Sequence, residues 1–124
     1  MLEKGMTYTS IIEVKEENTA LAMGSGDLAV FATPAMIALM ENAAMKTVAS
    51  FLPEDSTTVG GGIEASHLAP SPVGATIRAV AVLTGIEKRK LFFSIEAFQE
   101  DKLIGKATHI RFIVNRETFM GNLY

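Results

Sequence analysis

The sequence predicts an α+β fold in which an antiparallel sheet wraps around one long helix. A single helical run of apolar residues, 33–52, stands in the first half of the chain. Four strand-like runs follow it, joined by short turn-forming segments, and short links are typical of antiparallel neighbours. An earlier run, residues 6–15, is rich in threonine, tyrosine and isoleucine, which favours another strand. We therefore expect two layers, with the helix packed on the sheet.

The run at residues 33–52 predicts the central helix and also contains one ionisable side chain on its apolar face. Pro34 suits a first helical turn, the Thr33 hydroxyl can cap a free N–H group, and Pro53 ends the run. At 100° per residue, most apolar side chains fall on one broad arc. Glu41 lies inside this arc, where its carboxylate loses hydration unless it is paired, hydrogen-bonded or protonated. Glu41 is therefore a candidate functional acid.

The predicted strands carry apolar residues on both faces of the sheet. We expect them at residues 57–68, 76–86, 90–99 and 103–114, with a very short strand at 28–31. In the second of these runs, Ile77 and Leu83 alternate with Val80 and Val82. One helix covers only one face, so a second subunit is expected to cover the other face or an edge. The sequence thus predicts at least a dimer.

Composition narrows the class of protein. A length of 124 residues suits one domain, 1–124, and a net charge of -3 with scattered basic residues argues against nucleic acid or an anionic membrane as partner. No run approaches the roughly 20 apolar residues of a spanning helix, and the N-terminus lacks signal-peptide features, so a cytoplasmic location is expected. The chain has no cysteine, two histidines and no carboxylate cluster, so no metal site is expected.

His67 is the second candidate functional residue. By alternation it shares one strand face with Ile63 and Ala65, and it points toward the helix if Ile63 does. A lone inward histidine is often a plain core residue. A second inward ionisable group, Glu41 on the facing helix, favours a shared polar pocket instead. His109 has no comparable neighbours on its own strand and is interpreted as structural.

Three segments together resemble the hotdog-fold acyl-CoA thioesterases, and most closely the fluoroacetyl-CoA thioesterase-like branch. These segments are residues 33–44, the glycines at 60–62 and residues 66–74, within a likeness that spans about 28–114. The resemblance implies a hotdog fold, a homodimer or a tetramer, an acyl-CoA substrate, and no cofactor. The loop at 24–27 lacks the aromatic residues of the fluoroacetyl enzyme, so the acyl group is not specified.

The same resemblance assigns roles to seven residues. It implies a catalytic trio and a group of substrate-contacting residues, which are Thr33, Glu41 and His67 for catalysis and Gly60, Gly61, Phe31 and Pro34 for the substrate.

The spacing of the trio constrains how it could work. Eight helical residues span about 12 Å, so Thr33 and Glu41 cannot bond directly and need a substrate, a water, His67 or a partner subunit between them. In one mechanism Thr33 attacks the thioester, with His67 as base and Glu41 orienting it. In the other, Glu41 or His67 activates water while Thr33 positions the substrate. The sequence leaves both open.

Three functions fit these residues. The leading hypothesis is hydrolysis of a small or short-chain acyl-CoA thioester to the free acid and CoA. A hydratase or dehydratase on the same fold could use a carboxylate and a histidine for proton transfer, although the signature of aspartate followed by Asn-Pro and histidine is absent. A non-catalytic acyl-CoA binding module is the third reading, in which the polar pair only recognises the thioester.

Overall fold

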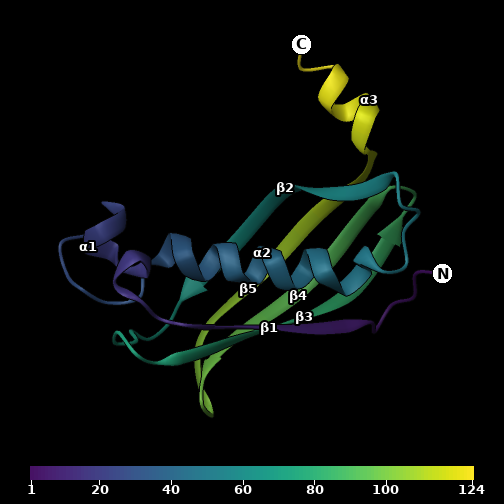
Figure 1. Ribbon diagram of the computed structural model, residues 1–124. Helices are drawn as coiled ribbons and strands as arrows, with labels where there is room; N and C mark the ends of the chain where they lie inside the picture. The colour runs from purple at the N-terminus through teal and green to yellow at the C-terminus, as the bar shows by residue number, and fades with distance from the viewer.

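The computed structural model describes residues 1–124 and contains one five-stranded antiparallel sheet with a long helix across it (Figure 1). The long helix is α2 (Thr33–Ala49), and three short helical segments are η1 (Glu16–Asn18), α1 (Ala20–Met23) and α3 (Arg116–Gly121). The strands, in spatial order, are β1 (Thr7–Glu13), β3 (Thr76–Glu87), β4 (Lys90–Gln99), β5 (Lys102–Asn115) and β2 (Ser56–His67). The predicted architecture is confirmed, and β1 and β2 form the two sheet edges.

The observed boundaries differ from the predicted ones mainly at the C-terminal end of the central helix. Helix α2 ends at Ala49 with Ser50 as its C-cap, whereas the prediction ran to residue 52. Residues 28–31 form no strand, only isolated bridges that join Phe31 to Thr19 and Val30 to Pro72. The short helices were not predicted, because segments of three to six residues are too short to establish a helical period.

The core lies between α2 and the inner face of the sheet. Twenty buried apolar residues form one cluster, and each large side chain buried there contributes roughly 1.5–3 kcal/mol. The long helix supplies its inward stripe and the sheet supplies alternate residues of its three central strands. The largest fully buried apolar side chains of these elements are Met36, Met40, Val48, Ile77, Leu83, Leu91, Phe93, Ile95 and Ile104.

The outer face of the sheet is partly covered by the chain itself. Phe92 and Phe98 are half-buried there. The guanidinium carbon of Arg78 lies 4.3 Å from the centroid of the Phe98 ring, and the Lys90 ammonium lies 5.1 Å from that of Phe92. Cations above aromatic rings are attracted to them. These two side chains therefore reduce the need for a second protein layer on this face.

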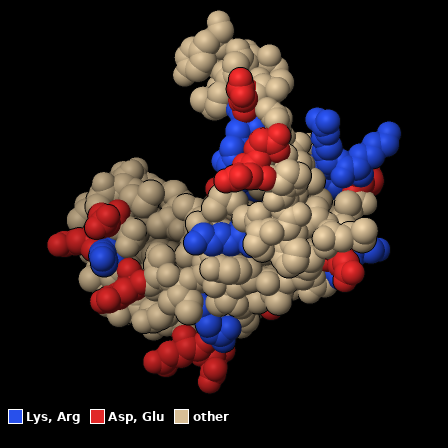
Figure 2. Space-filling view, turned by 45° about the vertical axis from the view of Figure 1, so that its right-hand side comes forward, with Lys and Arg blue, Asp and Glu red and all other residues tan.

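None of the helices, α2 included, has the length and the apolar character that crossing a membrane requires. Figure 2 shows acidic and basic side chains scattered over the visible face without a basic patch. The cytoplasmic location stays a prediction.

A glycine in β5 lets the start of α2 approach the sheet. A Cβ atom on Gly105 would overlap the sulfur of Met36 and lie 3.2 Å from the carbonyl oxygen of Ser66. Gly105 is paired with His67 across the β2–β5 ladder, and Met36 lies about one turn beyond Thr33. The missing side chain at Gly105 therefore brings Thr33 and His67 within reach of each other.

We expect Gly105→Ala to lower the free energy of unfolding by about 1–3 kcal/mol, because the added methyl group overpacks the contact with Met36. Urea denaturation measures this change. Gly62→Ala is the matched control, since no atom lies within 4 Å of its added Cβ. Equal stability of the two variants would show that this contact does not constrain the helix.

Candidate active site

Thr33 and His67 form a direct hydrogen-bonded pair. Thr33 Oγ1 lies 2.7 Å from His67 Nδ1, so the first residue of α2 contacts the last residue of β2. The predicted capping role of Thr33 is wrong: the N-cap is Ala32, and no side chain caps the helix. Because Thr33 is already the first helical residue, its hydroxyl points to the histidine instead of to the backbone.

His67 points toward α2, as its alternation predicted, and its other ring nitrogen is unsatisfied. Nε2 is buried and has no hydrogen-bond partner. The Phe31 ring stands edge-on to the imidazole, with ring centroids 6.2 Å apart. Burial lowers the pKa of His67 below 6.5, and the nearby backbone of Ala69 offsets part of that effect. The imidazole is therefore neutral near pH 7, as a base must be.

The pair opens onto a cavity of about 310 Å³ at the start of α2. Thr33, His67 and Phe31 line it, together with residues of α1, the loop that follows it and the segment after β2. Its remaining lining residues are Ala20, Ser25, Val30, Leu68, Ala69 and Pro70. A cavity of this size and mixed lining is in the range of small-molecule sites.

Glu41 lies in a different place, beside Gly60, His109 and Arg111. A Cβ on Gly60 would lie 3.1 Å from Glu41 Oε2, and 3.5 Å from both Arg111 Nη1 and His109 Cε1. Glu41 is half-buried and makes no hydrogen bond to Thr33 or His67. One chain thus brings together two of the three predicted catalytic residues and leaves the third about two turns away along α2.

Arg111 is a buried cation that holds this second cluster together. It is 7% exposed, and its guanidinium donates from Nε to Thr58 Oγ1 at 2.8 Å and from Nη2 to the Thr58 carbonyl oxygen at 3.0 Å. Burial lowers the pKa of Arg111, and the negative charge of Glu41 opposes that effect. Glu41 therefore supplies a nearby negative charge to a guanidinium taken out of water.

The protonation state of His109 follows from its two contacts. Its Nε2 lies 3.2 Å from Arg111 Nη1, and because arginine only donates, this nitrogen accepts. Nδ1 then carries the proton and donates to the Gly62 carbonyl oxygen at 2.7 Å. Burial lowers the pKa of His109, chiefly through lost hydration and further through the charge of Arg111. His109 is thus held neutral in one tautomer, which fits a structural role.

The predicted substrate-contacting residues fall into three groups. Phe31 lines the cavity, and Gly60 adjoins the Glu41 cluster. Gly61 faces the other side of the sheet, where an added Cβ would overlap the ring of Phe112. Pro34 is exposed in the first turn of α2 and does not line the cavity.

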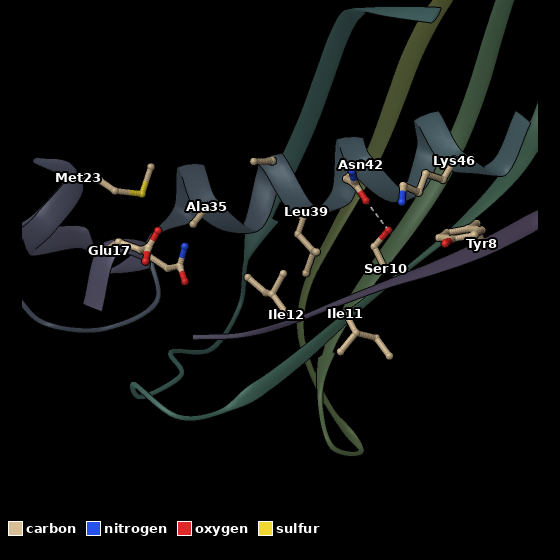
Figure 3. Close-up of a pocket in the computed structure, with 12 residues that line it drawn as sticks. Tyr8, Ser10, Ile11, Ile12, Glu17, Met23, Ala35, Leu39, Asn42 and Lys46 are labelled. Carbon is tan, nitrogen blue, oxygen red and sulfur yellow. Dashed lines mark hydrogen bonds between the residues drawn. The ribbon is translucent and has the colours of Figure 1, made fainter. Parts of the chain in front are cut away.

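A larger cavity, about 580 Å³, lies on the opposite side of α2, between that helix and β1 (Figure 3). Ser10 Oγ donates to Asn42 Oδ1 across it at 2.8 Å, and the Lys46 ammonium lies 5.9 Å from the centroid of the Tyr8 ring. None of the predicted catalytic residues lines this cavity, and it contains no histidine beside a hydroxyl.

The proximity of Arg111 to Glu41 was not predicted from the sequence. A signal was present, since Arg111 shares the inward face of its strand with His109 and Ala107. A cation at an inward position, like an acid on an apolar helix face, requires a counter-charge. The two could have been paired on that ground.

Comparisons with known proteins point to one family. A family model described as fluoroacetyl-CoA-specific thioesterase matches residues 14–117. The fluoroacetyl-CoA thioesterase of Streptantibioticus cattleyicolor is 34% identical over 90 residues, a match that covers 73% of this chain and 65% of that protein. The chain therefore matches somewhat less than two thirds of the length of this relative.

Solved structures agree in fold over nearly the whole chain. A phenylalanine-to-alanine variant of the fluoroacetyl-CoA-specific thioesterase, solved with fluoroacetate and CoA, has a TM-score of 0.89 and 28% identity, with 95% of this chain and 99% of that chain covered. A hot-dog-like protein from Thermanaerovibrio acidaminovorans has a TM-score of 0.89 at 20% identity, with 98% and 90% covered. The fold is the hotdog fold.

We expect the stability of the protein to fall as the pH drops below about 6.5. Both histidines have pKa values below 6.5 in the folded state, so the unfolded chain binds more protons in that window. Denaturant midpoints measured from about pH 7.5 to about pH 5.5 should decrease. A double variant, His67→Gln with His109→Gln, should show a flatter profile, and an unchanged slope would contradict the lowered pKa values.

Proposed function

Because the chain belongs to the family of fluoroacetyl-CoA-specific thioesterases, we propose that it hydrolyses the thioester of a small or short-chain acyl-CoA to the free acid and CoA. The observation that carries this proposal is the hydrogen bond of 2.7 Å between Thr33 Oγ1 and His67 Nδ1, at a cavity of suitable size. A hydroxyl paired with a neutral imidazole is the arrangement from which general-base catalysis starts.

The lowered pKa of His67 supports its role as the base. A neutral imidazole near pH 7 can take the proton of the Thr33 hydroxyl, or that of a water in its place. The Thr33 oxygen would then bond to the thioester carbon, and the carbon–sulfur bond would break as the CoA sulfur receives the proton back from His67. Water would release the acid from the threonine ester by the same base.

The uncapped end of α2 suits the oxygen of the thioester. No side chain caps the helix, so the backbone N–H groups of its first turn have no side-chain acceptor. The positive end of the helix dipole favours the negative charge that develops on a carbonyl oxygen during attack. Thr33 stands at this end, so nucleophile and oxyanion would meet at one place.

The position of Glu41 has different consequences for the two catalytic mechanisms that the sequence left open. Within one chain Glu41 neighbours Arg111 and His109 rather than His67. Orientation of His67 by Glu41 would therefore need a substrate, water or a second subunit between them. Activation of water by Glu41 needs only a substrate that reaches from the end of α2 to Gly60.

The substrate class rests on the relatives. The related enzyme solved with fluoroacetate and CoA has a two-carbon acid and CoA in its structure. The cavity beside Thr33, about 310 Å³, suits a small acyl group. We infer acyl-CoA as substrate, with no cofactor of the protein's own.

We also infer a homodimer through the free edge of β2. This strand has twelve residues, carries one acidic side chain, Glu64, and has no neighbour beyond it in the sheet. An unprotected edge of this length pairs readily with an identical one. A tetramer is less favoured, because Arg78 and Lys90 cover two of the outer aromatic rings, Phe98 and Phe92.

We expect Thr33→Val, Glu41→Gln and His67→Asn each to lower the turnover rate on a panel of acyl-CoA thioesters, the base variant by about a hundredfold or more. Thiol release measures this, and the absence of cysteine from the chain removes background thiol. Thr33→Val leaves the cap of α2 intact, because the Thr33 hydroxyl does not cap the helix.

Thr33→Ser is the matched control for this series, since it keeps the hydroxyl and should retain much of the activity. Full activity in all three other variants would refute the assigned roles. Tight acyl-CoA binding without turnover by the unaltered protein would favour the binding module instead.

Gly60→Ala tests whether the position of the Glu41 carboxylate matters. Its added Cβ would lie 3.1 Å from Glu41 Oε2, so the carboxylate must shift by a few tenths of an ångström. We expect turnover to fall by about tenfold, since a small misplacement of a catalytic group is costly. Gly62→Ala, whose Cβ meets no atom within 4 Å, should keep its activity. Equal turnover in both variants would show that the position of the Glu41 carboxylate does not affect the reaction.

A further inference from the structure

The C-terminal arm, residues 116–124, stands away from the rest of the chain. It consists of α3 and the three residues that follow, and Figure 1 shows it projecting beyond β2. Its main contacts are with β5, the strand that it continues. Four of its apolar side chains are 38–101% exposed, namely Phe119, Met120, Leu123 and Tyr124. An exposed apolar helix on a short arm is typical of a surface that meets a partner.

The base of the arm is fixed. Arg116 donates from its backbone N–H to the Asp55 carbonyl oxygen at 2.9 Å and from Nε to the Glu54 carbonyl oxygen at 3.3 Å. Asn115 caps α3 by accepting from the Thr118 N–H group at 2.9 Å. These bonds tie the arm to the turn that joins α2 to β2, so its direction is set by the fold.

The two-fold pairing of β2 edges determines what the arm would meet. Antiparallel pairing of identical edges has its axis perpendicular to the sheet, which keeps both long helices on one face. When the pairing is centred on the middle of β2, the start of one β2 lies beside the end of the other. The arm stands at the start of β2, since Asn115 is paired with Ser56. Its neighbour across the axis is therefore the segment that follows His67 of the partner subunit.

Part of an exposed apolar patch near the cavity of Thr33 and His67 lies in that segment. We name it the rim patch, and it consists of Leu21, Leu28, Leu68 and Val73. Each of these side chains is 48–66% exposed. Leu68 lines the cavity itself, and Leu28 accepts a backbone hydrogen bond from Leu21 at 3.0 Å, which holds these two residues together.

We propose that the C-terminal arm of each subunit packs on the rim patch of its partner and forms an outer wall of the cavity beside Thr33 and His67. This inference rests on the proposed β2 dimer. Phe119 and Met120 would bury their apolar surface against Leu68, which covers two exposed surfaces at once. The wall would exclude water from the thioester and limit the length of the acyl group, so each site would require both chains.

Cysteine cross-linking tests this contact directly, because the chain has no cysteine of its own. Two versions of different size are co-expressed, one carrying Met120→Cys and the other Leu68→Cys, and are then oxidised. We expect a disulfide-linked species of the combined mass. Ile11→Cys replaces Leu68→Cys in the control, since Ile11 is 61% exposed but lies on β1, at the opposite edge. The control pair should not cross-link.

Sedimentation and kinetics separate this inference from the proposed function. A dimer that cross-links at Met120 and Leu68 supports the arm, and a dimer in which neither Met120 nor Leu123 cross-links to Leu68 overturns it. A monomer overturns both the dimer and the arm, while thiol release still decides the activity.

The double variant Phe119→Ala with Met120→Ala should raise KM for short acyl-CoA about fivefold and extend activity to longer acyl groups, with the dimer intact. An unchanged acyl preference would contradict the proposed wall.

Discussion

The hydrogen bond between Thr33 and His67 depends on how closely the start of α2 approaches the sheet. Gly105 leaves room for Met36, so the first turn of the helix lies beside the end of β2. Ala32 takes the N-cap position, which leaves the Thr33 hydroxyl free for the imidazole. A larger residue at 105 or a cap by Thr33 would break the pair. Backbone packing thus sets the chemistry available at this end of the helix.

A second polar cluster occupies the middle of the same helix. Arg111 is buried, so it needs the charge of Glu41, and its contact with His109 fixes the tautomer of that ring. Glu41 therefore has a structural reason for its place as well as the proposed catalytic one. The two clusters face the same edge strand, β2, at Gly60 and at His67. A substrate or a second subunit along β2 could join them, which is why the proposed dimer matters to the mechanism.

The sequence predicted the fold well and the site in part. Strong periodicity placed α2 and the four long strands within a few residues, and alternation placed His67 on the inward face. The capping role of Thr33 was wrong, because local preference cannot distinguish the N-cap from the next residue. The partnership of Glu41 with Arg111 was missed, since it joins residues 70 positions apart and depends on the packing of α2 against β5. The arm could not be predicted, because α3 is too short to show a period.

The central claim is that the reacting carbonyl sits at the end of α2, between Thr33 and His67. The most direct measurement is a structure of the protein with a non-hydrolysable acyl-CoA thioester analogue. We predict that the carbonyl carbon lies about 3–3.5 Å from Thr33 Oγ1, a distance from which attack can proceed. An analogue whose carbonyl lies instead in the larger cavity between α2 and β1, beside Ser10 and Asn42, would contradict the account.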